Sequence, residues 1–289
     1  QVHTQTTSVE GRLVLSKSWR KDRALIPNFA PMLVLLSPAK TLSPALPSVP
    51  EIQNNLTEPL ALRHATAIVQ HLSSWSLAKT QKELKLSDTL AQRVFEWHQT
   101  WNPASPFAAG WTFQGDAFKS LNLPSWNLRD AQEAATRLRI LHGVYGILRP
   151  LDRYSPVRLE MAQAWSHDPG HRNLAGFWKT HLPSLVMSEM KEGRHSHILN
   201  LSSAEYGDVA LHGLSPNLVV TCQFLEDKNG KLKSISAFAK AARGAMAGHV
   251  LRNRLTSPND LEGFNDKGYV YDPERSSVSL KVFVRTLAP

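Results

Sequence analysis

The chain has a single cysteine, Cys222, among its 289 residues, so no disulfide bond can form within it. Chains without disulfides are typical of reducing compartments. Cys222 lies in the apolar segment NLVVTCQFLE, where a cysteine is more often a small core residue than a nucleophile. The sequence also lacks any run of about 18 apolar residues, so we expect no membrane span and no membrane partner.

Two common kinds of binding motif are missing as well. The segment LLSPAKT follows an apolar strand but lacks the glycines of a Walker phosphate-binding loop. The twelve histidines are scattered, and the closest pair, His195 and His197, has no carboxylate or cysteine at ligand spacing. We therefore predict no structural metal and no cofactor.

Acidic residues are scarce relative to basic ones. Lysine and arginine number 33 against 24 aspartates and glutamates, which gives a formal charge of +9 and an isoelectric point near 9.7. A basic excess favours anionic partners such as nucleic acid or nucleotides. Many soluble proteins are basic without such a partner, and charge alone supports both readings equally.

The first 31 residues differ from the rest of the chain. They show weak periodicity, carry five basic against two acidic residues, and precede Met32. This composition leans towards a targeting peptide, although disordered or added sequence would look similar. We predict an extension over 1–31 and a single domain over 32–289.

The remaining sequence alternates helical and strand patterns. Apolar runs predict strands at 33–36, 197–201 and 217–226, with an Asn-Gly turn at 229–230 and a further hairpin at 269–284. Helical patterns cover 57–72 (capped by Thr57), 76–101 with a break at 86–88, 127–143 (ended by Gly143), 174–191 and 236–255. These elements predict one compact mixed domain of the α+β class.

Polar residues follow two of the predicted strands. Ser37, Lys40 and Thr41 come after the first strand, and Ser203 and Glu205 follow the strand at 197–201. Open α/β sheets place binding groups at such strand ends. Lys40 could contact a phosphate, or act as a nucleophile if desolvation lowers its pKa. The turn FQGD adds Asp116 as a further polar candidate.

The helix predicted at 236–255 carries a basic stripe. At 100° per residue, Lys240, Arg243 and Arg254 fall within about 60° of one another. Gly244, on the same helix, lowers helix propensity by about 1 kcal/mol and suggests close approach by another element or a phosphate backbone. The stripe predicts a cleft wall, and the alternative is a solvated basic face.

The break between the two helices within 76–101 resembles a helix-hairpin-helix. Such hairpins present backbone N–H groups to a DNA phosphate. Here Lys85, Ser87 and Asp88 form the turn, but the Gly-x-Gly of the motif is missing. An ordinary corner between two helices is equally compatible with this sequence.

Charged residues also interrupt an apolar segment, ILHGVYGILRPLDRYSPVRLEM. Buried charges are rarely left without partners. Asp152 and Glu160 are close enough in sequence to orient Arg149 and Arg158 towards a bound phosphate. A buried ion-pair network without any ligand is the alternative.

Nine segments occur in the order seen in one family: LLSPAKTL, FQGD, LHGVYGILRPLD, RLEM, LNLSSAEY, FLEDKNGK, AKAARGAM, NRL and GF. From Met32 to about residue 284 the chain resembles the YaaA-like peroxide stress resistance proteins. The resemblance implies a compact mixed fold with a positively charged cleft, a helix-hairpin-helix element, and binding of duplex or branched DNA. It implies no established enzymatic reaction. The matching cleft positions are Lys40, Asp116, Arg149, Asp152, Arg158, Glu160, Lys240 and Arg243.

Family members are cytoplasmic bacterial proteins that limit damage when hydrogen peroxide meets intracellular iron. We therefore expect a cytoplasmic protein, or an organellar one if residues 1–31 are a transit peptide. Three functions stay open: a DNA-binding stress protein, an enzyme acting on nucleic acid or nucleotides through Lys40 and cleft carboxylates, and an iron-handling protein.

Overall fold

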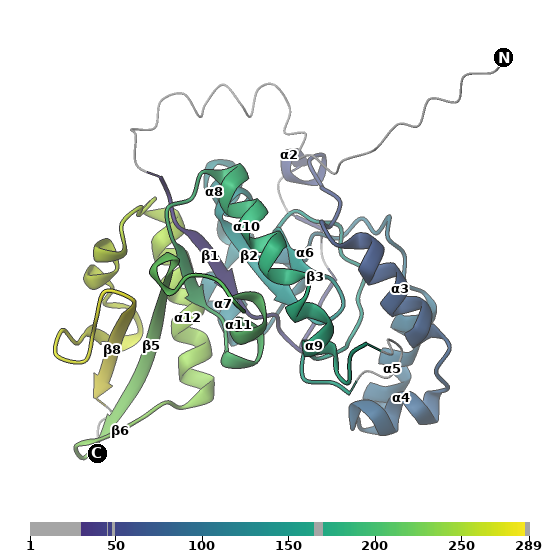
Figure 1. Cartoon of the computed structure of the whole chain (residues 1–289). Coiled ribbons are helices and arrows are strands. Elements are labelled where there is room, and N and C mark those ends of the chain that lie inside the picture. Colours follow the sequence, from purple (N-terminus) through teal and green to yellow (C-terminus); the bar gives the residue numbers. More distant parts are fainter. Residues whose placement is uncertain (1–29, 45, 48–49, 165–169, 287–289) are drawn as a thin grey trace.

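The computed structural model describes residues 30–286 apart from 45, 48–49 and 165–169. The extension predicted over 1–31 therefore lies almost wholly outside the described residues. Figure 1 shows a central sheet with helices packed around it, and three helices set to one side. The described chain is a mixed α+β fold, as the sequence predicts.

The sheet has eight strands and both parallel and antiparallel pairs. Its order is β3-β2-β1-β4-β5-β8-β7, and β6 pairs with β5. Four adjacent pairs, from β2-β1 to β5-β8, are parallel, whereas β3, β6 and β7 attach antiparallel. The strands are β1 (Leu33–Leu36), β2 (Leu138–His142), β3 (Gly146–Leu148), β4 (Ile198–Leu201), β5 (Val219–Lys228), β6 (Lys231–Lys233), β7 (Val270–Tyr271) and β8 (Leu280–Thr286).

Strand β1 is buried along its whole length, since all four of its residues are at most 1% exposed. Successive side chains of a strand point to opposite faces, so this burial requires cover on both sides of the sheet. Helix α12 packs against β1, β4 and β5 together with α7 and α8, while α10 packs against β1 and β3 with α9 and α11. These helices are α7 (Asp116–Leu121), α8 (Leu128–Arg137), α9 (Leu174–Lys179), α10 (Leu182–Gly193), α11 (Ala204–Ala210) and α12 (Ser236–Arg252).

The close packing of α7 on α12 depends on Gly244. A Cβ atom at this position would lie 1.8 Å from the carbonyl oxygen of Ala117, so no larger residue fits without displacing the α7 backbone. The glycine signal in the basic helix therefore marks close approach by a neighbouring helix. This contact fixes α12, and the cations on it, against the segment that begins at Asp116.

The helices set to one side are α3 (Leu62–Ser73), α4 (Leu77–Leu84) and α5 (Asp88–Gln99). Residues 85–87 alone separate α4 from α5, and Lys85 takes a left-handed conformation with φ of 52°. Leu86, Ala91 and Val94 form a small hydrophobic cluster of their own beneath this turn. The break predicted inside 76–101 is thus confirmed as a tight connection between two helices. Two further α-helices of the described residues are α2 (Pro50–Gln53) and α6 (Ala109–Thr112).

Most predicted elements are present, but two predictions were wrong. The helix expected over 127–143 ends at Arg137, and the chain continues directly into β2, with Leu138 already extended at ψ of 134°. Thr57 does not cap a helix: α3 begins at Leu62, and Thr57 bridges to Asp152 instead. The C-terminal hairpin forms from β7 and β8, although Val278 precedes the strand and is 90% exposed.

Across the described part of the chain, we find no helix both long enough and apolar enough to cross a membrane.

Candidate functional site

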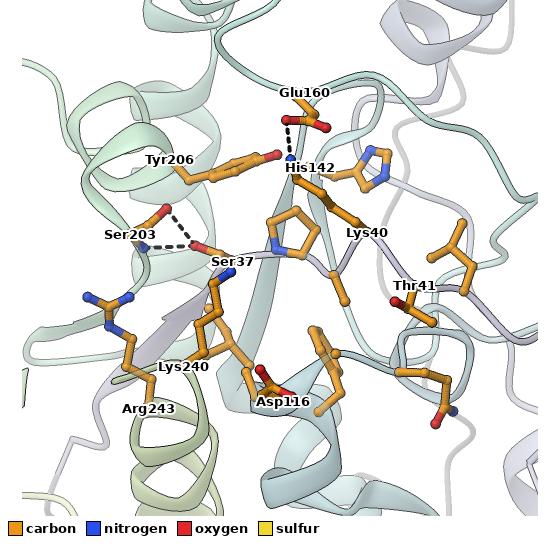
Figure 2. A pocket seen from close by; sticks show the side chains of 18 of the residues that line it. Ser37, Lys40, Thr41, Asp116, His142, Glu160, Ser203, Tyr206, Lys240 and Arg243 are labelled. Carbon is orange, nitrogen blue, oxygen red and sulfur yellow. Dashed lines mark hydrogen bonds and ion pairs between the residues drawn. The ribbon is translucent and has the colours of Figure 1, made fainter. Parts of the chain in front are cut away.

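A pocket of about 570 Å³ lies where several parallel strands end. Ser37 follows β1, His142 ends β2, and Ser203 follows β4. Because β1 pairs in parallel with both β2 and β4, these three residues meet at the same edge of the sheet. Open α/β sheets often bind ligands at this edge, so the pocket stays the predicted site. Figure 2 shows the labelled side chains around the opening.

Five separate parts of the chain complete the pocket wall. Residues 36–43, 114–119 and 157–160 are three of these parts. The end of β4 and the start of α11 contribute Leu201, Ser203, Glu205 and Tyr206, and Lys240 and Arg243 project from α12. The ionic side chains among the lining residues are five cations and three carboxylates: Lys40, Lys119, Arg158, Lys240, Arg243, Asp116, Glu160 and Glu205.

Two serines join the strand ends. The backbone N–H of Ser203 donates to Ser37 Oγ at 2.8 Å, and Ser37 Oγ donates to Ser203 Oγ at 3.2 Å. No histidine or carboxylate hydrogen-bonds to either hydroxyl among the described residues, so neither has the base that activates a serine nucleophile. The pair instead ties the loop after β1 to the loop after β4.

Glu160 forms ion pairs with two of the five cations. Lys40 Nζ lies 2.7 Å from Glu160 Oε2, and Arg158 Nη2 lies 3.1 Å from Glu160 Oε1. Burial alone would raise the pKa of Glu160, but its contacts with Lys40 and Arg158 hold that pKa below its ordinary value. The carboxylate is therefore ionised at neutral pH. Of the two charge pairs predicted for this segment, the one between Glu160 and Arg158 is present.

Lys240 and Arg243 have no ion-pair partner anywhere in the described part of the chain. They lie on the same face of α12, three residues apart, at the opposite side of the pocket from Glu160. Burial lowers the pKa of Arg243, and its Nε is buried without a hydrogen-bond acceptor. A partly desolvated guanidinium without an acceptor is costly, and a bound anion would relieve that cost.

His142 forms part of the inner wall as a neutral imidazole. Its Nδ1 accepts hydrogen bonds from the backbone N–H groups of Val144 and Tyr145, at 3.0 and 3.3 Å. Nε2 must then carry the proton, and it lies 3.2 Å from the hydroxyl oxygen of Tyr154. Burial lowers the pKa of His142 to about 3. A side chain held in this way supports the pocket wall and does not exchange protons near neutral pH.

Because three histidines are buried, we expect the protein to lose stability in mild acid. Burial lowers the pKa of His142 to about 3 and those of His98 and His195 to about 4, against about 6.5 when unfolded. Below pH 6.5 these histidines bind protons in the unfolded chain but not in the folded one. Each histidine therefore contributes its full stabilisation of the fold above pH 6.5 and loses it as the pH falls to its folded-state pKa. Burial raises the pKa of Asp152 to about 6, so its effect on stability has the opposite sign. As the pH falls from about 6 to 4, protonation of Asp152 stabilises the fold and cancels the loss from about one histidine.

We expect the urea midpoint to fall steadily from pH 6.5 to 4.5, with a net loss of a few kcal/mol. Each uncompensated group contributes up to about 1.4 kcal/mol per pH unit. Urea titrations at half-unit steps would measure this loss. A midpoint that stays constant down to pH 4.5 would contradict the neutral, buried assignment of these histidines.

Six predicted site residues lie outside the pocket: Arg149, Asp152, Arg254, Lys85, Ser87 and Asp88. Arg149 is buried and pairs with Glu189 of α10 at 2.6 Å, and Glu189 also binds Arg139 of β2. Burial alone would raise the pKa of Glu189, but the two arginines hold it below its ordinary value. Here the ion-pair alternative is the correct one, because the apolar segment carrying Arg149 enters the core and α10 supplies its counter-charge.

Asp152 is likewise internal. Its Oδ2 accepts from the backbone N–H of Arg149 at 2.7 Å, and Thr57 Oγ1 donates to Oδ1. Asp152 therefore fixes the turn after β3 and does not orient the Arg149 guanidinium towards a ligand.

Arg254 is separated from the basic stripe because α12 ends at Arg252. Arg254 has φ of 54°, and its guanidinium binds Asp130 of α8 at 2.9 Å. The helical spacing that grouped it with Lys240 does not apply beyond the last turn. Lys85, Ser87 and Asp88, the hairpin candidates, lie outside the pocket as well, and Asp88 Oδ1 accepts from Gln81 Nε2.

Two titratable lining residues were missed by sequence analysis, Lys119 and His142. Lys119 lies one turn after Asp116 on α7, a spacing that would have placed both on one face. His142 was hidden by the mistaken helix over 127–143. Tyr206, in the quoted motif LNLSSAEY, follows Glu205 and is 7% exposed, so its ring forms wall rather than rim.

The described residues contain no group of three or more histidine, cysteine or carboxylate side chains arranged to hold a metal ion.

Comparison with known proteins gives one family. The sequence model described as "Peroxide stress protein YaaA" matches residues 32–275. A UPF0246 protein of Magnetococcus marinus is 36% identical over 261 residues, which cover 89% of this chain and all of the relative. UPF0246 proteins of Cellvibrio japonicus and Legionella pneumophila are 36% and 35% identical over 259 residues, or 98% and 99% of their own lengths. The chain therefore belongs to the peroxide stress protein YaaA family.

Proposed function

We propose that this protein binds DNA, duplex or branched, and protects it during peroxide stress. The observation that carries the proposal is the pair Lys240 and Arg243, which face the pocket without any counter-ion in the described residues. Phosphate groups are the anions that such unpaired cations recognise in nucleic acids. The overall charge of +9 would add attraction at longer range.

The connection between α4 and α5 is a candidate second contact. Lys79 and Lys82 lie on α4, and Lys85 follows it in the turn. Ser87 precedes the first turn of α5, whose backbone N–H groups could face a phosphate. Two separated basic surfaces would suit a branched or bent DNA better than a short straight one.

Direct sensing of peroxide by the single cysteine is not favoured. Burial raises the pKa of Cys222 to about 12, and the side chain lies in the core beneath Arg243. The thiolate is the form that reacts with peroxide, and it is scarce at neutral pH in such a site. Protection through DNA binding needs no reaction at Cys222.

Salt dependence tests the proposal. If phosphate contacts dominate, the logarithm of affinity for duplex DNA should fall linearly with the logarithm of salt concentration, by about 0.9 per phosphate neutralised. Fluorescence anisotropy of a labelled duplex between 50 and 300 mM salt (roughly the range where such slopes are measured) would give the slope. Absence of binding at low salt, or a slope near zero, would overturn DNA binding through phosphates.

Lys40 distinguishes a binder from an enzyme. Its ammonium group pairs with Glu160 at 2.7 Å, and the side chain is 64% exposed. Arginine can replace a lysine that contacts phosphate, but it cannot supply a nucleophilic amine. We expect Lys40→Arg to keep most DNA affinity and Lys40→Met to lose part of it, with Lys179→Met, on the exposed end of α9, as the control.

Borohydride reduction in the presence of abasic DNA is the second measurement on the same variants. We expect no covalent adduct with the wild type or with either Lys40 variant. An adduct on the wild type that Lys40→Arg abolishes would replace the binding function with a lyase-like reaction.

A further inference from the structure

The size of the pocket restricts which part of a DNA molecule can enter it. About 570 Å³ lies within the range of roughly 300–1,000 Å³ typical of pockets that enclose a small molecule. A base pair stacked in a duplex is shielded by two phosphate backbones and reached only through grooves about 6 and 12 Å wide. Paired DNA can therefore place phosphates at the mouth of the pocket, but it cannot fill the interior.

The lining is chemically complementary to a nucleotide rather than to a bare phosphate. Cations stand on two sides, and Figure 2 shows Lys240 and Arg243 across the opening from Lys40 and Glu160. The same pocket also has apolar surface, which comes from Pro38, Leu42, Phe118, Val157, Leu159 and Leu201. The Tyr206 ring lies beside the Glu160 group. Inorganic phosphate would use one charged side and leave this surface bare.

The two charged sides are not equivalent. Glu160 already neutralises Lys40 and Arg158, at 2.7 and 3.1 Å. Lys240 and Arg243 have no counter-ion among the described residues, whereas a buried Nε without an acceptor is found on both sides, in Arg243 and in Arg158. An incoming phosphate is thus stabilised most beside α12, and a base attached to it would extend over the apolar surface towards Tyr206.

We propose that the pocket receives one unpaired nucleotide of a DNA strand, with its phosphate beside Lys240 and Arg243 and its base in the apolar interior. This inference rests on the proposed function and names the part of DNA that the site recognises. Extruding a base from a perfect duplex costs a few kcal/mol, and the cost is least where the base is mismatched or unpaired. The protein would therefore prefer DNA with an unpaired nucleotide over the same sequence fully paired.

Three DNA duplexes of equal length test the preference: one fully paired, one with a single unpaired nucleotide, and one with an abasic unit at that position. We expect the second to bind about tenfold more tightly than the first at the same salt concentration. The abasic duplex keeps the extra backbone unit and its phosphate but lacks the base. We expect it to bind like the paired duplex. Equal affinity of the abasic and the unpaired duplex would overturn the role given to the base.

A variant with a filled pocket tests the same preference from the side of the protein. Thr41 is exposed and lines the opening, so Thr41→Trp adds an indole there without removing charge. We expect the ratio of affinities for unpaired and paired duplex to fall from about ten to near one. Thr180→Trp adds the same side chain at an exposed position outside the pocket and should leave the ratio at about ten.

A competition measurement on the wild type does not depend on the folding of any variant. A free deoxynucleoside monophosphate should remove the preference for the unpaired duplex, whereas inorganic phosphate at equal ionic strength should not. If the mononucleotide binds but the unpaired duplex has no advantage, the pocket serves a free nucleotide and the DNA assignment is wrong.

The outcomes separate the two proposals. If no duplex binds in a salt-dependent way, the proposed function itself fails. If all three duplexes bind equally, with the expected salt slope, DNA binding stands and the assignment of the pocket to an unpaired nucleotide of DNA is rejected.

Discussion

Replacing Lys240 and Arg243 together by alanine is expected to weaken binding of duplex DNA about tenfold to a hundredfold at moderate salt. These two side chains share one face of α12, line the pocket and carry no ion pair in the described residues. Loss of one or two phosphate contacts should also flatten the salt slope by about one to two units, with little change in sequence preference. Anisotropy titrations of the double variant over a salt series would measure both effects.

The control for this variant removes the same charge elsewhere. Arg129 on α8 and Lys191 on α10 are exposed, and neither lines the pocket. Their double alanine variant should change affinity far less, because exposed charges act through a screened field. If both double variants lose equal affinity, net charge and not the α12 surface governs binding.

Replacing Glu189 by alanine is expected to cost about 3–5 kcal/mol of stability, the largest effect of any single change considered. Its side chain is 1% exposed and pairs with both Arg139 and Arg149. Removing it would leave two guanidinium groups in the core without a carboxylate, and an uncompensated buried charge costs several kcal/mol. Urea unfolding followed by circular dichroism would measure the change in the free energy of unfolding.

Glu192 offers a matched control one turn further along α10. It approaches the same Arg149 at 3.7 Å but is 50% exposed, so Glu192→Ala should cost less than about 1 kcal/mol. Glu189→Gln keeps the shape and should be less damaging than alanine, which provides a measurable variant if the alanine one does not fold. Equal stability of the Glu189 and Glu192 variants would contradict the role given to the buried ion pairs of Glu189 with Arg139 and Arg149.

The sheet shows where sequence patterns suffice and where they do not. Strands β1, β4 and β5 could be predicted because each is an isolated apolar run with turn residues around it. Strand β2 could not, since it follows α8 with no glycine, proline or loop between Arg137 and Leu138. Its residues are apolar enough to continue the helical pattern, and only pairing with β1, about a hundred residues earlier, makes them extended.

The pocket shows the same limit for charged residues. Lys240 and Arg243 could be grouped because both lie within one helix. Arg254 was grouped wrongly because the sequence does not mark the end of α12, and Arg149 because its partner Glu189 is 40 residues away. Helical spacing predicts neighbours within a helix, but counter-ions across the sheet depend on tertiary packing.

The order in which the pocket is assembled has a consequence for synthesis of the chain. Strand β1 is made before both of its partners, residues 138–140 and 198–201, and the cations of α12 come later still. At about 5–20 residues per second, a ribosome needs roughly 10–40 s to pass from β1 to α12. Until residues 138–140 are made, roughly 5–20 s after β1 at that rate, the apolar sequence LVLL has no strand to pair with and is a candidate for chaperone binding. Products truncated before α12 would lack Lys240 and Arg243, so the DNA contacts proposed for those side chains would become available only late in translation.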